Sequence, residues 1–75
     1  MNYEIHTEAQ ELMLKVGNQL PREIEDKQKL LCIRRMSILT CNELIEELEL
    51  LGFDYNSTQV QYWIKVKQFI KKYYV

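Results

Sequence analysis

The sequence predicts an all-α fold, a small bundle of about four helices in one domain spanning residues 1–75. Apolar residues recur every three or four positions over most of the chain, which is the period of an amphipathic helix. Residues that end helices separate these segments. Gly17 and Pro21 follow the first segment, and Gly52 follows a later one. With 47% hydrophobic and 28% charged residues, the composition is that of a globular protein.

The first predicted helix runs from residue 6 or 7 to residue 16, inside an N-terminal amphipathic segment of residues 1–20. Gly17 and Asn18 indicate its end, because both residues tolerate the left-handed conformation that terminates a helix. Pro21 then blocks further helix. The apolar residues of the segment form one stripe that we expect to face the core: Ile5, Ala9, Leu12, Met13, Val16 and Leu20.

The second predicted helix, about Arg22 to Arg35, opens a helix-turn-helix core that spans residues 21–75. Acidic residues stand at its start and basic residues at its end, a polarity that complements the helix dipole. Its first half offers few apolar side chains. We therefore expect its N-terminal turns to lie over solvent.

The third predicted helix, Thr40 to Leu51, has the clearest start in the sequence. Thr40 and Glu43 have the spacing of a capping box, in which each side chain satisfies a backbone N–H of the first turn. Gly52 occupies the position of a left-handed residue after the helix, and Phe53 can fold back onto the last turn. The expected inner face is Leu44, Ile45, Leu48 and Leu51, and the expected outer face is Glu43, Glu46, Glu47 and Glu49.

The fourth predicted helix begins at Ser57, after a run of turn-forming polar residues that starts at Asp54. Val60, Trp63 and Ile64 form its inward stripe at the i, i+3 and i+4 spacing. The polar side chains between them are expected to point outward, where they can touch a partner: Gln59, Gln61, Tyr62 and Lys65.

Two interpretations of the C-terminal segment stay open. One is a single helix that continues to Tyr74, and the other is a helix that ends near Lys67 and is followed by a short strand over residues 69–75. The β-branched and aromatic residues of that run suit a strand. We favour the helix because no glycine, proline or asparagine marks a break.

The run LTCNELIEELELLGFDYNSTQVQYWIK resembles the helix-turn-helix of winged-helix DNA-binding regulators, most of all the mercury-resistance (MerR-like) type. The matching positions are Glu43-Leu44-Ile45 and the run from Thr58 to Lys65, which contains the pair Tyr62-Trp63. In that family the second helix enters the DNA major groove and a β-hairpin wing touches phosphates, and the tail from Phe69 is similar to the first wing strand. The resemblance implies a dimeric transcription regulator whose partner is double-stranded DNA, with residues 1–20 as an extension that mediates dimers.

Residues 52–75 carry four lysines against Asp54, which gives the fourth predicted helix a basic end. Lysines interleaved with tyrosines are expected where phosphates and base edges are contacted. They are equally expected on a solvated helix face that keeps an apolar segment soluble. In the DNA-binding interpretation Gln59, Gln61 and Lys65 face base edges. Tyr62 belongs to the same basic and aromatic surface. The residues toward phosphate are Asn56, Ser57, Thr58, Lys67, Lys71 and Lys72.

The alternative function belongs to a different class, a protein-interaction module that acts as an inhibitor or adaptor and binds no nucleic acid. The C-terminal helix carries more aromatic residues than so small a chain can bury, which favours docking on a partner or on a second copy. The acidic face of the third helix is also suited to mimic nucleic acid toward a basic partner. The aromatic residues are Tyr62, Trp63, Phe69, Tyr73 and Tyr74.

Nothing in the sequence favours an enzyme, a cofactor or a metal site. His6, the one histidine, is predicted to be exposed or to cap a helix, and Cys32 and Cys41 are predicted to be small buried hydrophobic residues. Two thiols and one distant histidine cannot supply four zinc ligands. No apolar run approaches the roughly 20 residues of a membrane span, and the N-terminus does not resemble a signal peptide, so we expect a cytoplasmic protein.

Overall fold

The computed structural model describes the backbone of residues 2–73 and the side chains of residues 4–72. Over that part of the chain there are three helices and no strand: α1 (Asn2–Asn18), α2 (Asp26–Leu50) and α3 (Thr58–Tyr73). The all-α prediction is confirmed, but the described residues form three helices where about four were predicted. The strand alternative for the tail is wrong as far as Tyr73, which is helical, while Tyr74 and Val75 lie outside the described residues.

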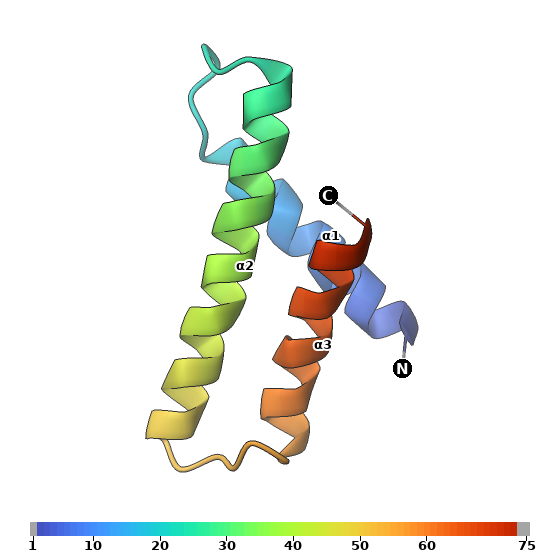
Figure 1. Ribbon diagram of the computed structural model, residues 1–75, viewed down its shortest axis with the longest axis vertical. Coiled ribbons are helices and arrows are strands. Elements are labelled where there is room, and N and C mark those ends of the chain that lie inside the picture. The colour runs from blue at the N-terminus through green and yellow to red at the C-terminus, as the bar shows by residue number, and fades with distance from the viewer. Residues whose placement is uncertain (1, 74–75) are drawn as a thin grey trace.

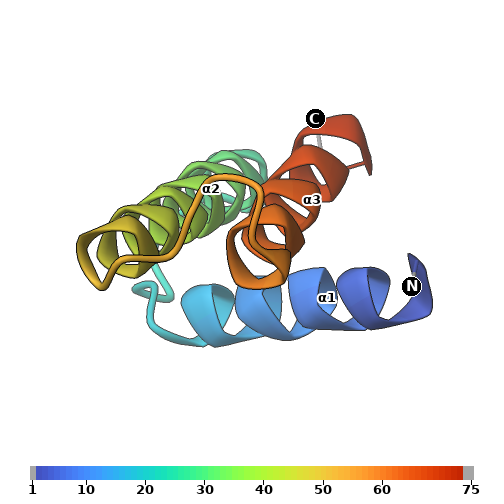
Figure 2. The ribbon, with the colours of Figure 1, turned by 90° about the horizontal axis from the view of Figure 1, so that it is seen from below.

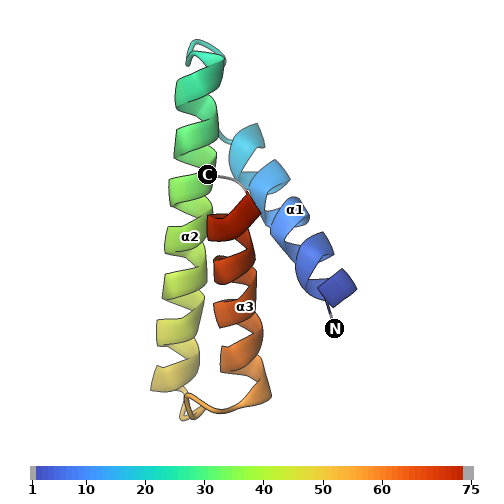
Figure 3. The same ribbon diagram turned by 45° about the vertical axis from the view of Figure 1, so that its right-hand side comes forward.

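The helices α2 and α3 run antiparallel and lie side by side, and α1 crosses behind both of them (Figure 1). Seen from below, α1 forms a separate layer under the α2–α3 pair (Figure 2). The oblique view in Figure 3 shows that α2 extends well beyond the end of α3. The first turns of α2 accordingly lie over solvent, as predicted, and Asp26, Lys27 and Gln28 are all exposed.

The region from residue 26 to residue 50 is one continuous helix, so the predicted break before Thr40 is wrong. The Thr40 hydroxyl does not cap a helix start but donates a hydrogen bond of 2.8 Å to the Met36 carbonyl, one turn earlier in the same helix. Ser37, predicted to lie between two helices, is fully buried in the middle of α2. No glycine or proline interrupts residues 26–50, so extending the helix keeps every internal backbone hydrogen bond.

The end of α2 agrees with the prediction. Gly52 has φ +98°, and its N–H donates to the Glu49 carbonyl at 3.0 Å. The Phe53 N–H donates to the Leu48 carbonyl at 2.9 Å. These two bonds form a Schellman motif, which satisfies the last carbonyls of the helix and turns the chain toward α3.

Gly52→Ala is expected to destabilise the fold by roughly 1–2 kcal/mol, because a Cβ atom is unfavourable at this left-handed φ. No neighbouring atom lies within 4 Å of the place a Cβ would occupy, so the cost is one of backbone conformation and not of crowding. Urea unfolding measures it. Gly52→Asn is the matched control and is expected to lose less, because asparagine tolerates positive φ better. Equal losses for alanine and asparagine would contradict this explanation.

The start of α3 also agrees with the prediction. The Ser57 Oγ accepts a hydrogen bond of 3.3 Å from the N–H of Val60, which makes Ser57 the N-cap residue. Val60 is fully buried, and Trp63 and Ile64 are half-buried, so the predicted inward stripe is present. The C-terminus of α2 and the N-terminus of α3, which flank the loop, are thus both capped.

The hydrophobic core lies where the three helices meet. Its fully buried members come from all three: Ala9 of α1, Cys41 of α2, and Val66 and Ile70 of α3. The predicted α1 stripe is confirmed: four of its residues belong to this cluster or pack against it, Val16 is buried and Leu20 is half-buried. The partly buried side chains around the cluster are Ile5, Leu12, Met13, Ile38, Tyr62, Trp63 and Phe69.

His6 is neither exposed nor a capping residue, contrary to the prediction, because α1 begins at Asn2. Its half-buried ring packs edge-on against Phe69, with the ring centroids 4.9 Å apart. Phe69, Tyr62 and Trp63 all pack against the central cluster and are partly buried, so these aromatic residues are not a free docking surface. The other two aromatic residues predicted for that surface lie outside the described side chains: Tyr73 and Tyr74.

Candidate interaction surfaces

The pairing of α2 and α3 differs from the predicted helix-turn-helix corner. In a helix-turn-helix the two helices meet at about 90–120° across a turn of three or four residues. Here they run antiparallel and are joined by residues 51–57, which is the arrangement of an αα-hairpin (Figure 3). Of the α3 side chains predicted to face base edges, Gln59 and Lys65 are exposed and Gln61 is half-buried.

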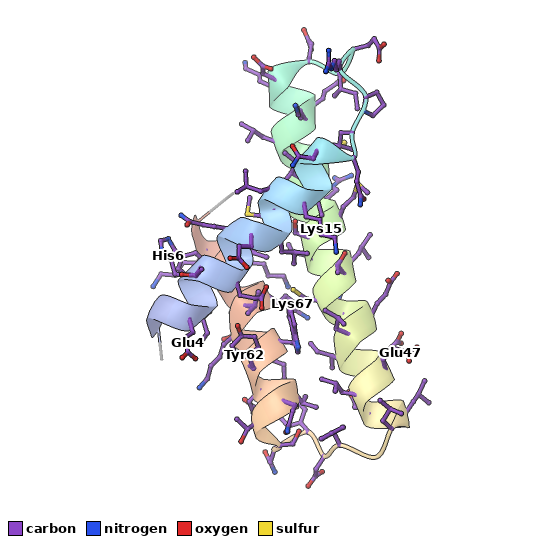
Figure 4. All side chains as sticks on the ribbon, turned by 180° about the vertical axis from the view of Figure 1, so that it is seen from behind. Glu4, His6, Lys15, Glu47, Tyr62 and Lys67 are labelled. Carbon is purple, nitrogen blue, oxygen red and sulfur yellow. The ribbon has the colours of Figure 1, made fainter. Side chains whose placement is uncertain are left out.

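Tyr62, predicted to point toward a partner, instead lies between α3 and α1 (Figure 4). Its hydroxyl donates a hydrogen bond of 3.3 Å to a carboxylate oxygen of Glu8, and its ring packs edge-on against Trp63. Burial raises the pKa of Tyr62, and the charge and hydrogen bond of Glu8 raise it further. The shallow depression beside it is lined by Glu4, Thr7, Glu8, Glu11 and Tyr62, an acidic surrounding that repels phosphate.

Three more of the predicted DNA-binding residues take part in internal contacts. The half-buried Lys67 donates a hydrogen bond of 2.8 Å to the Asn42 side-chain oxygen and so ties α3 to α2. The Gln61 amide donates a bond of 2.8 Å to the carbonyl of Tyr55. Ser57 is the N-cap of α3. Of these three contacts, only that of Lys67 joins α3 to another helix.

The remaining predicted residues of this site are exposed: Asn56, Thr58, Gln59, Lys65, Lys71 and Lys72. Along α3, the residues Gln61, Lys65, Gln68 and Lys72 recur at i, i+4, i+7 and i+11, so they occupy one side of the helix. We call this set the basic stripe. Two of its members, Lys65 and Lys72, belong to the predicted DNA face and are exposed.

The loop end of the hairpin has the opposite charge. Between Arg35 and Lys65 the sequence contains five acidic residues and no lysine, arginine or histidine. All five are exposed: Glu43, Glu46, Glu47, Glu49 and Asp54. Glu47 is seen to point away from the bundle in Figure 4. This end of the molecule therefore repels polyanions and attracts cationic partners.

Large apolar side chains are exposed at the same end. Leu50 is 81% exposed, Leu51 is 73% exposed and Tyr55 is 61% exposed, with Phe53 beside them at 37%. We call these four residues the apolar corner. Leu51 was predicted to face the core, and that prediction is wrong, because α2 ends beside it and nothing among the described residues covers the last turn.

The apolar corner was missed at the level of sequence, although a signal for it exists. Leu50 and Leu51 are adjacent, and neighbouring residues of a helix lie about 100° apart, so one stripe cannot bury both equally well. Eight of the nine large apolar side chains that are exposed in the described residues belong to α2 and the loop after it. They are Leu30, Leu31, Met36, Leu39, Leu50, Leu51, Phe53 and Tyr55.

The two cysteines are free and differ in environment: Cys41 is buried in the core, as predicted, and Cys32 is half-buried. Burial raises the pKa of the Cys41 thiol from 9.0 to about 11, while the nearby Lys67 acts in the opposite direction. The folded protein holds this proton between pH 9 and 11, where the unfolded chain releases it. Its contribution to stability is therefore complete below pH 9 and is lost as the pH rises toward 11.

We accordingly expect the free energy of unfolding to fall between pH 9 and 11, and to fall less steeply in Cys41→Ala. Urea unfolding at a series of pH values checks this expectation. Tyr62, whose pKa is also raised, is present in both proteins, so its effect cancels in the comparison. Identical slopes for the two proteins would contradict the expectation.

No family model, curated protein or solved structure matches this chain. Among the described residues no group of three or more histidine, cysteine, aspartate or glutamate side chains is placed to hold a metal ion. None of the helices α1, α2 and α3 combines the length and the apolar character that crossing a membrane requires. The resemblance to winged-helix regulators stays a prediction.

Proposed function

We propose that this chain is a small protein-interaction module that binds a basic protein partner through the apolar corner. The exposure of Leu50 and Leu51 supports this proposal most directly. Isolated exposed leucines are common on protein surfaces, but contiguous apolar patches with a polar rim are typical of protein-binding sites. Tyr55 adds an aromatic side chain of the kind that is enriched at the centres of such sites.

The chemistry of the partner follows from the rim of the corner. Glu46, Glu47 and Glu49 precede it and Asp54 lies within it, without a basic residue nearby in the chain. A complementary surface has an apolar centre surrounded by lysines or arginines. An amphipathic helix with leucines on one side and lysines on the other has these properties.

A synthetic amphipathic Leu–Lys helix serves as the probe, and amide chemical shifts of the labelled protein serve as the measurement. We expect shifts over residues 46–55 and binding that weakens with salt. The double variant Leu50→Ser/Leu51→Ser is expected to lose about tenfold or more in affinity. Leu14→Ser is the matched control, because Leu14 is 67% exposed on α1, away from the corner. Shifts confined to α3, or equal losses in both variants, would overturn the proposal.

Double-stranded DNA is the second candidate partner, favoured by the basic stripe. Lys65 and Lys71 are exposed cations on α3. Their number limits the affinity, because each phosphate contact adds only one step of counterion release. A gel shift on random DNA over a salt series tests this candidate, with Lys65→Glu expected to weaken binding and Glu47→Gln as the control. Absence of a shift at low salt would remove it.

A further inference from the structure

The outward side of α2 carries a stripe that is not part of the apolar corner. Arg35, Leu39 and Glu43 each lie two residues from Ser37 or Cys41, which are both fully buried. Two residues are about 200° around a helix, so the three side chains face directly away from the core. All three are exposed, and Leu39 is exposed at 57%.

Apolar side chains extend this stripe at its middle and toward the N-terminus of α2. Met36, three residues before Leu39, is 40% exposed, and Leu31, eight residues before it, is 52% exposed. Residues four apart form a ridge on a helix, and when two helices pack, the ridges of one fit into the grooves of the other. We call Leu31, Arg35, Met36, Leu39 and Glu43 the α2 ridge.

Charge is divided between the two halves of α2 around the ridge. Residues 26–35 contain four basic residues and one acidic residue, whereas residues 43–50 contain four glutamates and no basic residue. Within the described part of the chain, neither Arg35 nor Glu43 forms an ion pair. Both charges are thus available to a partner that places an acidic group opposite Arg35 and a basic group opposite Glu43.

We propose that a second copy of this chain is that partner, and that two α2 helices pack antiparallel through the α2 ridge about a two-fold axis at Leu39. Arg35 and Glu43 are each four residues from Leu39. Antiparallel packing about that residue places Arg35 of each copy level with Glu43 of the other. A parallel pair would instead set arginine against arginine and glutamate against glutamate, which is unfavourable.

The symmetric arrangement also explains the composition of the ridge. At the two-fold axis Leu39 meets its own copy, with Met36 of both chains beside it, so the apolar contact lies at the centre and the charges lie outside it. A two-fold interface uses one surface patch twice. This interface and the apolar corner involve different residues, so the corner can bind its partner whether or not the chain dimerises.

Sedimentation equilibrium from about 1 μM to about 1 mM tests the pairing, together with charge-reversed variants. We expect the wild type to dimerise reversibly, and Arg35→Glu and Glu43→Arg each to weaken the dimer about tenfold, since each variant creates two repulsive pairs. The double variant Arg35→Glu/Glu43→Arg restores both pairs and is expected to return to within about threefold of the wild type. Far-UV circular dichroism checks that every variant is folded. A wild type that stays monomeric, or a double variant as weak as the single ones, overturns the proposal.

Oxidative cross-linking locates the axis. In a Cys32→Ser background, Leu39→Cys is expected to give a covalent dimer, because the two thiols meet at the axis. Leu14→Cys, exposed on α1, is the control and is expected to stay monomeric. In the wild type the two Cys32 thiols would be 14 residues apart along the pair, roughly 21 Å, too far for a disulfide. Rapid cross-linking of wild-type Cys32, or of Leu14→Cys as fast as Leu39→Cys, contradicts this register.

Discussion

Ile70→Ala is expected to lower the free energy of unfolding by about 2–5 kcal/mol, because the substitution leaves a cavity in a close-packed core. Ile70 is the largest fully buried side chain among residues 4–72, and it lies where α3 meets both of the other helices. Small domains are stable by only about 5–15 kcal/mol, so a loss of this size removes a large part of the total.

Urea unfolding followed by circular dichroism measures the loss for Ile70→Ala. Lys71→Ala is the matched control, since it removes an exposed side chain one residue further along the same helix. We expect the control to change stability by no more than about 0.5 kcal/mol. Comparable losses in the two variants would mean that Ile70 is not in the core.

Ala9→Asp is expected to cost about 3–5 kcal/mol, because it places an unpaired carboxylate in the core. Ala9 is a fully buried α1 member of the central cluster, and three other α1 side chains pack against that cluster. The cost is predicted to shrink at low pH. Burial raises the pKa of the new carboxyl group in the folded state, so below the unfolded pKa of about 3.9 both states are neutral.

Leu14→Asp separates this effect from the helix propensity of aspartate. It introduces the same residue into the same helix at a position that is 67% exposed. We expect the control to cost less than about 1 kcal/mol and to show no rise in relative stability as the pH falls. If Ala9→Asp is no worse than Leu14→Asp, α1 does not pack on the hairpin as described.

Several elements of this fold could be predicted because their signals are local. The α1 stripe, the glycine turn at Gly52 and the cap at Ser57 each depend on side chains within a few residues of one another, and all three are confirmed. The break before Thr40 was predicted with the same kind of signal and is wrong. A threonine three residues before a glutamate fits a capping box, but a threonine hydroxyl can also bond one turn back inside a helix.

For α2, the absence of glycine and proline was a better signal than the capping-box spacing at Thr40. The lack of glycine and proline, which favoured a single helix as far as Tyr74, also holds for residues 26–50, and their one asparagine, Asn42, does not interrupt α2. The places of Tyr62 and Lys67 could not be predicted in this way. Their partners, Glu8 and Asn42, come from other helices, and the sequence pattern of one helix does not determine which of its sides a distant helix covers.

The unbroken length of α2 determines how the corner and the ridge are spaced. Leu39 and Leu50 are 11 residues apart in one continuous helix, which corresponds to roughly 16 Å along its axis. In the antiparallel pair the two apolar corners would consequently sit at opposite ends of the assembly, about 33 Å apart. Such a pair is bivalent, and it would hold a ligand with two suitably separated sites far more tightly than either corner alone.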